Sequence, residues 1–441
     1  MQKNLNKTVA QQWVFNLMNR LVSNANFAAI LLFFATVLAL IFANSGLQTW
    51  YYSFWEHKFG FEIDGYLYLK KSLHHWINDG LMAIFFFVVG LELKRELIGG
   101  ELSNPRKAVL PLAAAMGGMI FPAAVYLIFN FDSDAQSGWG IPMATDIAFA
   151  LGVLHLLGNR IPTSVKVFLT VLAIADDLGA VLVIAFFYTS EISMFNLGIG
   201  FLFLAVLLLA NKIGVRSATF YAVFGIGGVW LFFLMSGVHA TIAAVLIAFM
   251  IPARTLIDEN TFMTKVQKLL VEFKNHDVNN HALLENNQLQ TLNKIQKITV
   301  AAMTPLQRLE NKLQPLVSYL IIPIFAFANA GVTFSGSLSY SLLSNVTLGV
   351  IFGLIFGKCI GILGVSSVLI KLKLAKFPTN MHFTHLVGVG FLASIGFTMS
   401  LFVTELAFVN STYIKDAKIG IFFASIAGGV IGYFILRNTK K

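Results

Sequence analysis

The sequence predicts an all-α polytopic membrane protein with twelve transmembrane helices, because of its composition and the length and pattern of its apolar runs. Hydrophobic residues make up 57% of the 441 residues, charged residues make up 12%, and the mean hydropathy is +0.76. An ordinary soluble domain has about 25% charged residues. A helix crosses a hydrocarbon core of roughly 30 Å with about 20 apolar residues. Since lipid offers the backbone no hydrogen-bond partner and the runs lack the alternation of barrel strands, each span must be a helix.

Twelve apolar segments fit such spans, although several are short or interrupted. They lie near residues 27–43, 77–98, 108–131, 138–157, 164–190, 192–211, 217–234, 236–252, 314–334, 346–370, 381–404 and 418–436. Residues 1–26 are polar and carry Lys3, Lys7 and Arg20, unlike a cleavable signal peptide. We therefore expect the first apolar run to remain in the protein as a membrane anchor.

The net charge of +10 follows from membrane topology and does not indicate a nucleic-acid partner. If the N-terminus is cytoplasmic and the loops alternate between the two sides, most Lys and Arg residues fall on the cytoplasmic side. The other side receives only Lys58, Lys70, Lys71, Lys415 and Lys418. The positive-inside rule then places both termini in the cytoplasm.

Two segments outside the spans have their own patterns. Residues 59–70, "FGFEIDGYLYLK", alternate apolar and polar side chains around an Asp64-Gly65 turn, which predicts an exposed hairpin; a disordered connector is the alternative. Residues 253–313 are polar, with periodic Leu, Val and Ile, which predicts a long cytoplasmic loop with one or two amphipathic helices. About 60 residues is close to the lower end of domain size, so we do not expect a second domain.

Two segments that lie 250 residues apart resemble each other. "GWGIPMATDIAF" at 138–149 and "GVGFLASIGFTM" at 388–399 share Gly-x-Gly and a centre of small residues. Both place Gly, Pro or Ser in mid-membrane, where a helix is easily interrupted. Paired interrupted segments in the two halves of a polytopic chain indicate a binding site at the midplane of a transporter.

The single cysteine, Cys359, excludes an intramolecular disulfide and a thiolate metal cage within one chain. We therefore look for the chemistry among the ionisable residues inside the spans. The ionisable residues of the spans are Asp79, Glu92, Asp146, Asp176, Asp177, Lys358 and Glu405. A charge at the bilayer centre costs roughly 2.5 to 3.5 kcal/mol. We therefore expect the ionisable residues that lie deepest in the membrane to have a function.

Asp176 and Asp177 are neighbours on one helix, so their side chains project about 100° apart. Desolvation and mutual repulsion favour protonation of at least one carboxylate unless a cation enters. A proton and a cation therefore compete for this pair, and oxygen ligands suit a hard cation such as Na⁺ or Li⁺. Thr145, just before Asp146, adds a hydroxyl or a carbonyl near the break.

Lys358 and Asp146 each have two interpretations. Lys358 is the one base deep in the spans, and we expect it to have a carboxylate partner, either in the site or in a salt bridge that only holds helices together. Asp146 either binds the ion or caps the end of a broken helix.

These residues lie in segments that resemble the NhaA-type sodium/proton antiporter family over nearly the whole chain. The segments are "FFFVVGLELKREL", "GIPMATDIAFALGVL", "LTVLAIADDLGAVLVIAFFYT", "SGVHATIAAV", "PIFAFANAGV", "GLIFGKCIGI" and "GFLASIGFTMS". The resemblance implies one transport domain over residues 1–441, with twelve helices in inverted repeats and two broken helices, the fourth and eleventh, crossing at the midplane. It also implies exchange of two protons in for one Na⁺ or Li⁺ out, for pH and sodium homeostasis in a bacterial inner (plasma) membrane, without a cofactor.

The resemblance also implies roles for individual residues. Asp176 and Asp177 become the cation- and proton-binding pair, Asp146 and Lys358 compensate the dipoles of the broken helices, and Thr145 lies beside the site. Whether Lys358 carries a proton or only stabilises stays open. The hairpin at 59–70 is implied to join two subunits of a homodimer.

The resemblance implies that the pH response maps to Glu92, Glu96 and Glu310. His239 is a fourth candidate, because it lies in a segment that resembles the family and an imidazole titrates in the right range. The competing interpretations are surface ion pairs beside Lys94 and Arg95 for the acids, and packing or capping for the histidine. The long loop adjoining Glu310 departs from the best-known members of the family.

Two other classes of function compete with an antiporter. An intramembrane aspartyl protease needs two carboxylates that face each other across a water, whereas adjacent residues diverge, and a base such as Lys358 disturbs a shared proton. A sodium-coupled symporter needs polar groups for an organic substrate, and the spans offer few.

Overall fold

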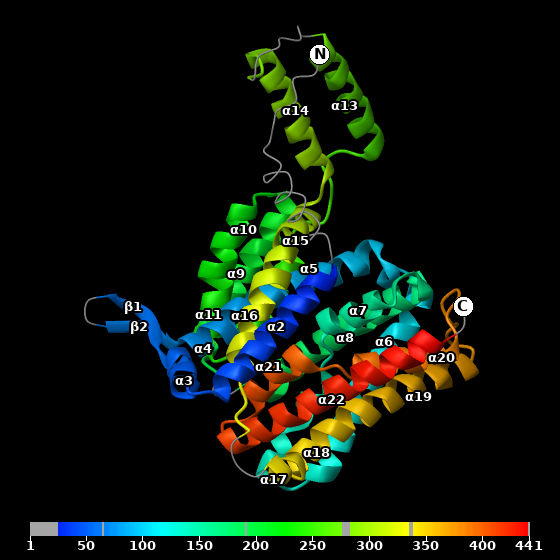
Figure 1. Cartoon of the computed structure of the whole chain (residues 1–441). Coiled ribbons are helices and arrows are strands. Elements are labelled where there is room, and N and C mark those ends of the chain that lie inside the picture. The colour runs from blue at the N-terminus through cyan, green and yellow to red at the C-terminus, as the bar shows by residue number, and fades with distance from the viewer. Residues whose placement is uncertain (1–24, 64–65, 190–191, 276–282, 335–337, 440–441) are drawn as a thin grey trace.

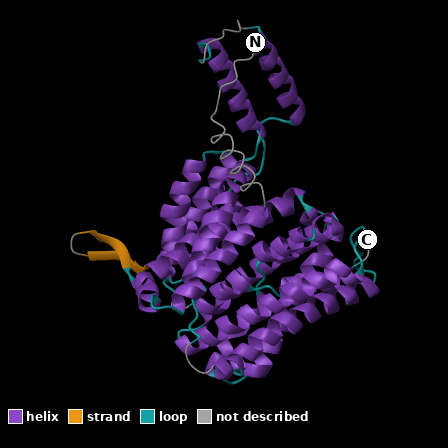
Figure 2. Ribbon diagram, in the orientation of Figure 1, coloured by secondary structure: helices purple, strands orange, loops and turns teal. Residues whose placement is uncertain are grey.

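The protein is described here by a computed structural model that covers residues 25–63, 66–189, 192–275, 283–334 and 338–439. The described chain consists of helices and one two-stranded antiparallel sheet (Figure 2). The predicted Asp64-Gly65 turn and the basic residues Lys3, Lys7 and Arg20 lie outside the described residues.

The first half of the chain supplies the elements up to the eighth predicted span. They are α2 (Ala25–Ala43), α3 (Gln48–Glu56), β1 (Lys58–Ile63), β2 (Tyr66–Ser72), α4 (Leu73–His75), the π-helix η1 (Trp76–Leu81), α5 (Met82–Gly99), the 3₁₀ turn η2 (Glu101–Ser103), α6 (Pro105–Asn130), the 3₁₀ helix η3 (Asp134–Met143), α7 (Ile147–Leu156), the 3₁₀ turn η4 (Gly158–Arg160), α8 (Thr163–Phe187), α9 (Met194–Ile213), α10 (Ala218–Phe224), the π-helix η5 (Gly225–Trp230), α11 (Leu231–Ser236) and α12 (Ala240–Met250).

The second half begins with the polar segment and continues into the last spans. Its elements are α13 (Glu259–Lys274), α14 (Asn286–Ala302), α15 (Pro305–Leu316), the π-helix η6 (Val317–Ile321), α16 (Ile322–Asn329), α17 (Leu338–Leu342), α18 (Asn345–Phe352), the π-helix η7 (Gly353–Gly357), α19 (Lys358–Lys371), α20 (Phe383–Ala393), α21 (Phe397–Ala407) and α22 (Ser411–Asn438).

Within the described residues, eight helices are long and apolar enough to cross a membrane, or ten if each of two bent pairs is one span. The bent pairs are α2 with α3, at 112°, and α20 with α21, at 45°. The structure therefore confirms an all-α polytopic membrane protein. The two remaining predicted spans lie on η1–α5, where α5 carries four charged residues, and on α12, which has only eleven residues. A total of twelve spans and the inverted repeats stay predictions.

The fourth and eleventh predicted spans are both interrupted near their centres. Residues 144–146 are extended between η3 and α7, where Pro142 has already removed one backbone donor. Residues 394–396 separate α20 from α21. The two interruptions touch, because the backbone N–H of Asp146 donates to the carbonyl of Ile395 at 2.6 Å.

Close packing of small residues fixes the helices around these interruptions. α6 lies against α19, and Gly117 faces Gly361 so closely that a side chain on either residue would collide with the backbone of the other helix. Small residues let membrane helices approach in this way. Asp176 of α8 lies near the same contact, since a methyl group on Gly118 would be 3.8 Å from its Oδ1 atom.

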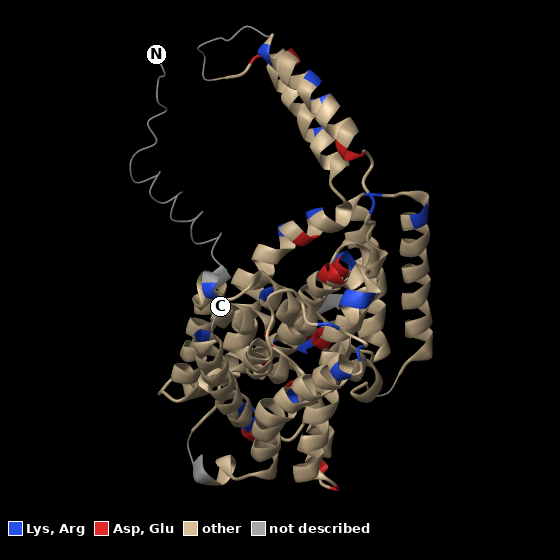
Figure 3. Ribbon diagram, turned by 90° about the vertical axis from the view of Figure 1, so that its right-hand side faces the viewer, with Lys and Arg blue, Asp and Glu red and all other residues tan. Residues whose placement is uncertain are grey.

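Two hairpins project from the helical body (Figure 1). One consists of β1 and β2, which pair antiparallel from Lys58 with Ser72 to Ile63 with Tyr66. The other consists of α13 and α14, which carry charges of both signs, whereas long stretches of the body are uncharged (Figure 3). Within residues 253–313, predicted as a long cytoplasmic loop with one or two amphipathic helices, the structure has α13, α14 and the start of α15 at Pro305, which continues through η6 into the ninth span. The cytoplasmic placement of this segment stays a prediction.

Candidate functional site

The two adjacent aspartates lie in the middle of α8 and are completely buried. Asp176 and Asp177 each have 0% of their surface exposed. The apolar segment around them forms a helix because lipid and protein leave its backbone no other hydrogen-bond partner. The helix thus holds two carboxyl groups deep inside the protein, where each needs a proton, a donor or a cation.

Asp176 has two partners from two other helices. Its Oδ2 atom lies 3.0 Å from Nζ of Lys358 in α19, and both side chains are fully buried. The same oxygen accepts a hydrogen bond of 2.8 Å from the hydroxyl of Thr145. The expected carboxylate partner of Lys358 is therefore Asp176. The other oxygen, Oδ1, has no hydrogen-bond partner among the described residues.

Asp177 has no donor at all within the described part of the chain. Neither of its oxygens, Oδ1 or Oδ2, is hydrogen bonded, and both are buried. An uncompensated buried charge is far more costly than a neutral carboxylic acid in the same place. Asp177 is consequently suited to hold a proton or a cation that comes from outside the protein. With Oδ1 of Asp176, three buried carboxylate oxygens are available to such an ion.

Asp146 caps two helices at once. Its Oδ1 atom accepts the N–H of Phe149 in the first turn of α7, at 3.0 Å. Its Oδ2 atom accepts both the N–H and the hydroxyl of Thr398 in the first turn of α21, at 3.0 Å and 2.5 Å. The N-terminal ends of helices carry partial positive charge, which a carboxylate stabilises. Because both oxygens already have donors, the contacts favour capping over direct ion binding by Asp146.

The side chain of Lys358 lies at the C-terminal end of an interrupted helix, where backbone carbonyls carry partial negative charge. Its ammonium group donates to the carbonyl of Met143, the last residue of η3, as well as to Asp176. The hydroxyl of Thr145 lies 3.0 Å from the carbonyl of Ala393, the last residue of α20, and shares its one proton between this carbonyl and Asp176. The negative ends of the two interrupted helices therefore face donors, and their positive ends face Asp146.

The candidate pH-response residues lie in two separate places. Arg95 of α5 bridges Glu96, at 3.1 Å, and Glu310 of α15, with which it makes a short ion pair. Glu92 belongs to the same cluster, since it interacts electrostatically with Arg95 and Glu310. Lys94 is occupied elsewhere, because it donates to the carbonyls at the end of α12.

His239 is not part of this cluster. It precedes α12, and its Nε2 atom lies 3.0 Å from the carbonyl of Tyr188, just after α8. This contact is of the kind expected if His239 packs against or caps a helix, which is the alternative to a role in pH sensing. The histidine does, however, link α12 to the helix that carries Asp176 and Asp177.

Sequence reasoning missed two residues that complete these arrangements. Thr398 supplies two of the three hydrogen bonds to Asp146, but one hydroxyl in an apolar helix is too common a feature to stand out. Arg95 was interpreted only as a neighbour of the acids, whereas it joins α5 to α15. The "GFTMS" segment that contains Thr398 was the one available signal.

Comparison with known proteins gives consistent matches over most of the chain. A sequence model of the family described as Na⁺/H⁺ antiporter 1 matches residues 19–436. A protein of Oleidesulfovibrio alaskensis named Na⁺/H⁺ antiporter NhaA is 48% identical over 411 residues, which are 93% of this chain and 91% of that protein. A protein of Wolinella succinogenes with the same name is 45% identical over 425 residues, with 95% and 93% covered. The Na⁺/H⁺ antiporter NhaA 1 of Saccharophagus degradans is 45% identical over 422 residues, with 95% and 90% covered.

Proposed function

Because the chain belongs to the Na⁺/H⁺ antiporter 1 family, we propose that it exports Na⁺ or Li⁺ in electrogenic exchange for protons, two protons for each cation. The coarser description, a sodium/proton antiporter that is a secondary transporter and not an enzyme, follows from the family itself. The observation that best supports the proposed exchange is the environment of Asp177. Among the described residues, its two buried carboxylate oxygens have no donor, and its neighbour Asp176 is paired with Lys358. The family implies no cofactor, and Na⁺ is a substrate.

The geometry accounts for competition between Na⁺ and protons. Without Na⁺, a proton on Asp177 removes the cost of a bare buried charge. When Na⁺ arrives, the carboxylates of Asp176 and Asp177 supply hard oxygen ligands and the proton leaves. The second proton is the one that the Asp176–Lys358 pair holds. It leaves from Lys358 once the ion pair is broken, or from Asp176 if that carboxyl carries the proton and Lys358 is neutral. Thr145, which already contacts Asp176, orients that carboxylate.

The interrupted helices give the site a way to change its exposure. Their four ends meet around Asp146, Lys358 and Thr145 instead of forming continuous backbone ladders. A few side-chain contacts then hold the two half-helix pairs, so one side of the site can rearrange without unwinding a whole span. We include in the proposal that these spans belong to twelve helices in inverted repeats.

The competing functions fit the contacts less well. In an aspartyl protease, two carboxylates share a proton, but Asp146 caps two helices and Asp176 is paired with Lys358. A sodium-coupled symporter would share the cation site, but the relatives that match this chain are named as Na⁺/H⁺ antiporters. Neither alternative is retained.

Electrogenic exchange predicts that a membrane potential changes the transport rate. Two protons in for one Na⁺ out moves one net charge per cycle, so the initial rate of Na⁺-driven proton movement in proteoliposomes should rise or fall when a potassium diffusion potential is imposed. Such a potential supplies about 2.3 kcal/mol per charge for each 100 mV. Equal initial rates at zero and imposed potential would show electroneutral exchange, and the stoichiometry would then be wrong.

We also propose that the cluster of Glu92, Glu96 and Glu310 around Arg95 sets the pH response, with low pH as the inactive condition. Gln at position 310 mimics the protonated acid, so Glu310→Gln should shift the pH profile of exchange toward higher pH with little change in the maximal rate. Glu259→Gln, an exposed acid on α13, is the matched control. An unchanged profile in Glu310→Gln would leave the cluster as a structural ion pair. His239 is included as a secondary candidate, and the profile of His239→Gln tests it in the same assay.

The remaining parts of the proposal concern placement and assembly. The homologues and apolar helices support a multi-pass protein of the bacterial inner membrane, and we propose that both termini are cytoplasmic. Thiol labelling of a cysteine introduced at Lys440 in intact cells and in inside-out vesicles tests this orientation.

The β1–β2 hairpin projects from the body and is proposed to join two subunits. If a chain that lacks residues 58–72 keeps the mass of a dimer in detergent, the hairpin does not hold the dimer together.

A further inference from the structure

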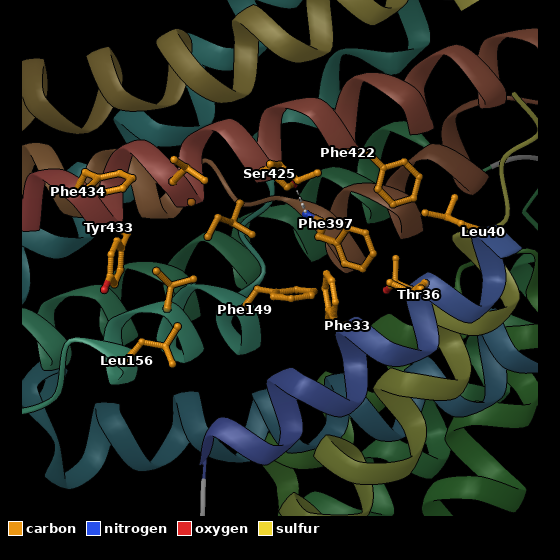
Figure 4. A pocket seen from close by; sticks show the side chains of 16 residues that line it. Phe33, Thr36, Leu40, Phe149, Leu156, Phe397, Phe422, Ser425, Tyr433 and Phe434 are labelled. Carbon is orange, nitrogen blue, oxygen red and sulfur yellow. Dashed lines mark hydrogen bonds between the residues drawn. The ribbon is translucent and has the colours of Figure 1, made fainter. Parts of the chain in front are cut away.

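An apolar groove of about 430 Å³ lies between α2, α7 and α22. Phe33 and Leu40 of α2 form one wall. Phe149 of α7 lies beside Phe33, and Leu156 of α7 lies toward the end with Tyr433 (Figure 4). The side chains of α22 from Phe422 to Phe434 line the groove along its length. The groove is separate from the proposed ion site, whose carboxylates do not line it.

The lining offers hydrocarbon to whatever occupies the groove. Two hydroxyl groups in the lining are already used, because Thr36 donates to the carbonyl of Leu32 at 2.8 Å and Ser425 accepts the N–H of Phe397 at 3.3 Å. The phenol of Tyr433 lies at one end of the groove. An occupant of this groove must therefore be apolar along most of its length.

The position and length of the groove fit a lipid tail. Its rim is exposed, as shown by Phe33 at 61%, Leu156 at 67% and Ile426 at 67%, and these residues belong to apolar spans that face the bilayer. From Phe422 to Phe434 the groove follows α22 for about 18 Å at 1.5 Å per residue. One leaflet contributes about 15 Å of the hydrocarbon core. The groove thus matches one acyl chain of one leaflet.

Positive charge lies at the end of the groove where Tyr433 is found. Arg437 follows Phe434 by one turn on α22, and Arg160 follows Leu156 at the end of α7. Both arginines are exposed, and among the described residues neither makes an ion pair or a hydrogen bond through its side chain. A guanidinium group matches the geometry of a phosphate and forms paired hydrogen bonds with it. Tyrosine is also frequent at the level of lipid headgroups.

We propose that this groove binds an anionic phospholipid, with one acyl chain along α22 and the phosphate between Arg160 and Arg437. The other end of the groove reaches the interrupted helices. The ring of Phe397, in the first turn of α21, lies 5.1 Å from that of Phe149 and 5.5 Å from that of Phe422. The bound chain packs against these rings, directly behind the half-helices that Asp146 caps.

Photo-crosslinking tests this site with two lipids that differ only in the headgroup. The protein is reconstituted with phosphatidylglycerol or phosphatidylcholine that carries a diazirine in its acyl chain, and the labelled residues are identified by mass spectrometry. We expect labelling of groove residues on α7 and α22, several-fold stronger with phosphatidylglycerol and reduced by unlabelled phosphatidylglycerol. Equal labelling by the two lipids would show ordinary bilayer contact and overturn the proposal.

Two variants separate the headgroup contact from the groove. Arg160→Gln with Arg437→Gln should remove the preference for phosphatidylglycerol, while Arg106→Gln, an exposed arginine elsewhere, should keep it. Gly429→Leu should remove labelling by both lipids, because the new side chain points into the groove and its Cβ meets Ile395 at an ordinary 3.4 Å. Its control is Gly198→Leu, which enters open space on α9.

Groove labelling that survives Gly429→Leu, or a headgroup preference that survives the double arginine variant, would contradict the assignment. The arginine variants change exposed side chains only, so they decide the question even if Gly429→Leu fails to fold.

Discussion

Asp177→Asn is expected to abolish Na⁺-dependent proton movement while the protein still inserts into the membrane. Asparagine has nearly the same shape but neither binds a proton at this position nor supplies a negative charge to Na⁺. Because neither oxygen of Asp177 has a donor among the described residues, no hydrogen bond of the fold is lost with the charge. The measurement is the Na⁺-induced pH change in everted vesicles or proteoliposomes.

The control for this prediction is Asp132→Asn. Asp132 is exposed and has a φ of 55°, a conformation that asparagine also tolerates, so the substitution makes the same chemical change without strain. Normal exchange by Asp132→Asn, with no exchange by Asp177→Asn at equal amounts in the membrane, is the expected pair of results. Retained exchange in Asp177→Asn would remove this residue from the ion pathway.

Lys358→Met is expected to destabilise the protein strongly, and Asp176→Asn is expected to restore much of the loss. In the parent protein, Nζ of Lys358 lies 3.0 Å from Oδ2 of Asp176. Methionine fills the space of the lysine stem but leaves the carboxylate of Asp176 buried beside an apolar group. Breaking one partner of a buried pair costs about 3 to 5 kcal/mol. In the double variant both charges are gone, so the uncompensated carboxylate no longer exists.

Chemical unfolding in detergent measures the three variants as a double-mutant cycle. The control is Lys371→Met, an exposed lysine in the last turn of α19, which should change the free energy of unfolding little. If Lys358→Met is as stable as the parent protein, Asp176 accepts a proton without cost, and Lys358 has no stabilising role. Exchange by Lys358→Met, which keeps both aspartates, under an imposed potential would then show whether Lys358 carries one of the two protons.

Much of the architecture could be predicted because lipid imposes a simple rule on the sequence. Any long apolar segment must be a helix, and Pro142 and the neighbouring glycines mark where one helix is interrupted. The buried aspartates stood out because each is costly in a membrane. The polar residues Arg308, Glu310 and Lys312 concealed that the helix of the ninth span begins before its apolar run, at Pro305, where α15 packs on α5.

The contacts inside the site could not be predicted in the same way. A sequence places Asp146 near an interruption but does not show that its two oxygens face two different helices. The same holds for Lys358, whose second partner is the backbone carbonyl of Met143. Backbone groups freed by an interruption have no signature in the sequence, because every residue carries them.

Proton release on Na⁺ binding tests the central claim, that Na⁺ and protons compete for Asp176 and Asp177, most directly. Calorimetric titration of the purified protein with Na⁺ in buffers that differ in ionisation enthalpy gives the number of protons released per ion bound. We predict that the parent protein releases protons when it binds Na⁺ and that Asp177→Asn releases none. Na⁺ binding without proton release, or equal release from the variant, would contradict the account.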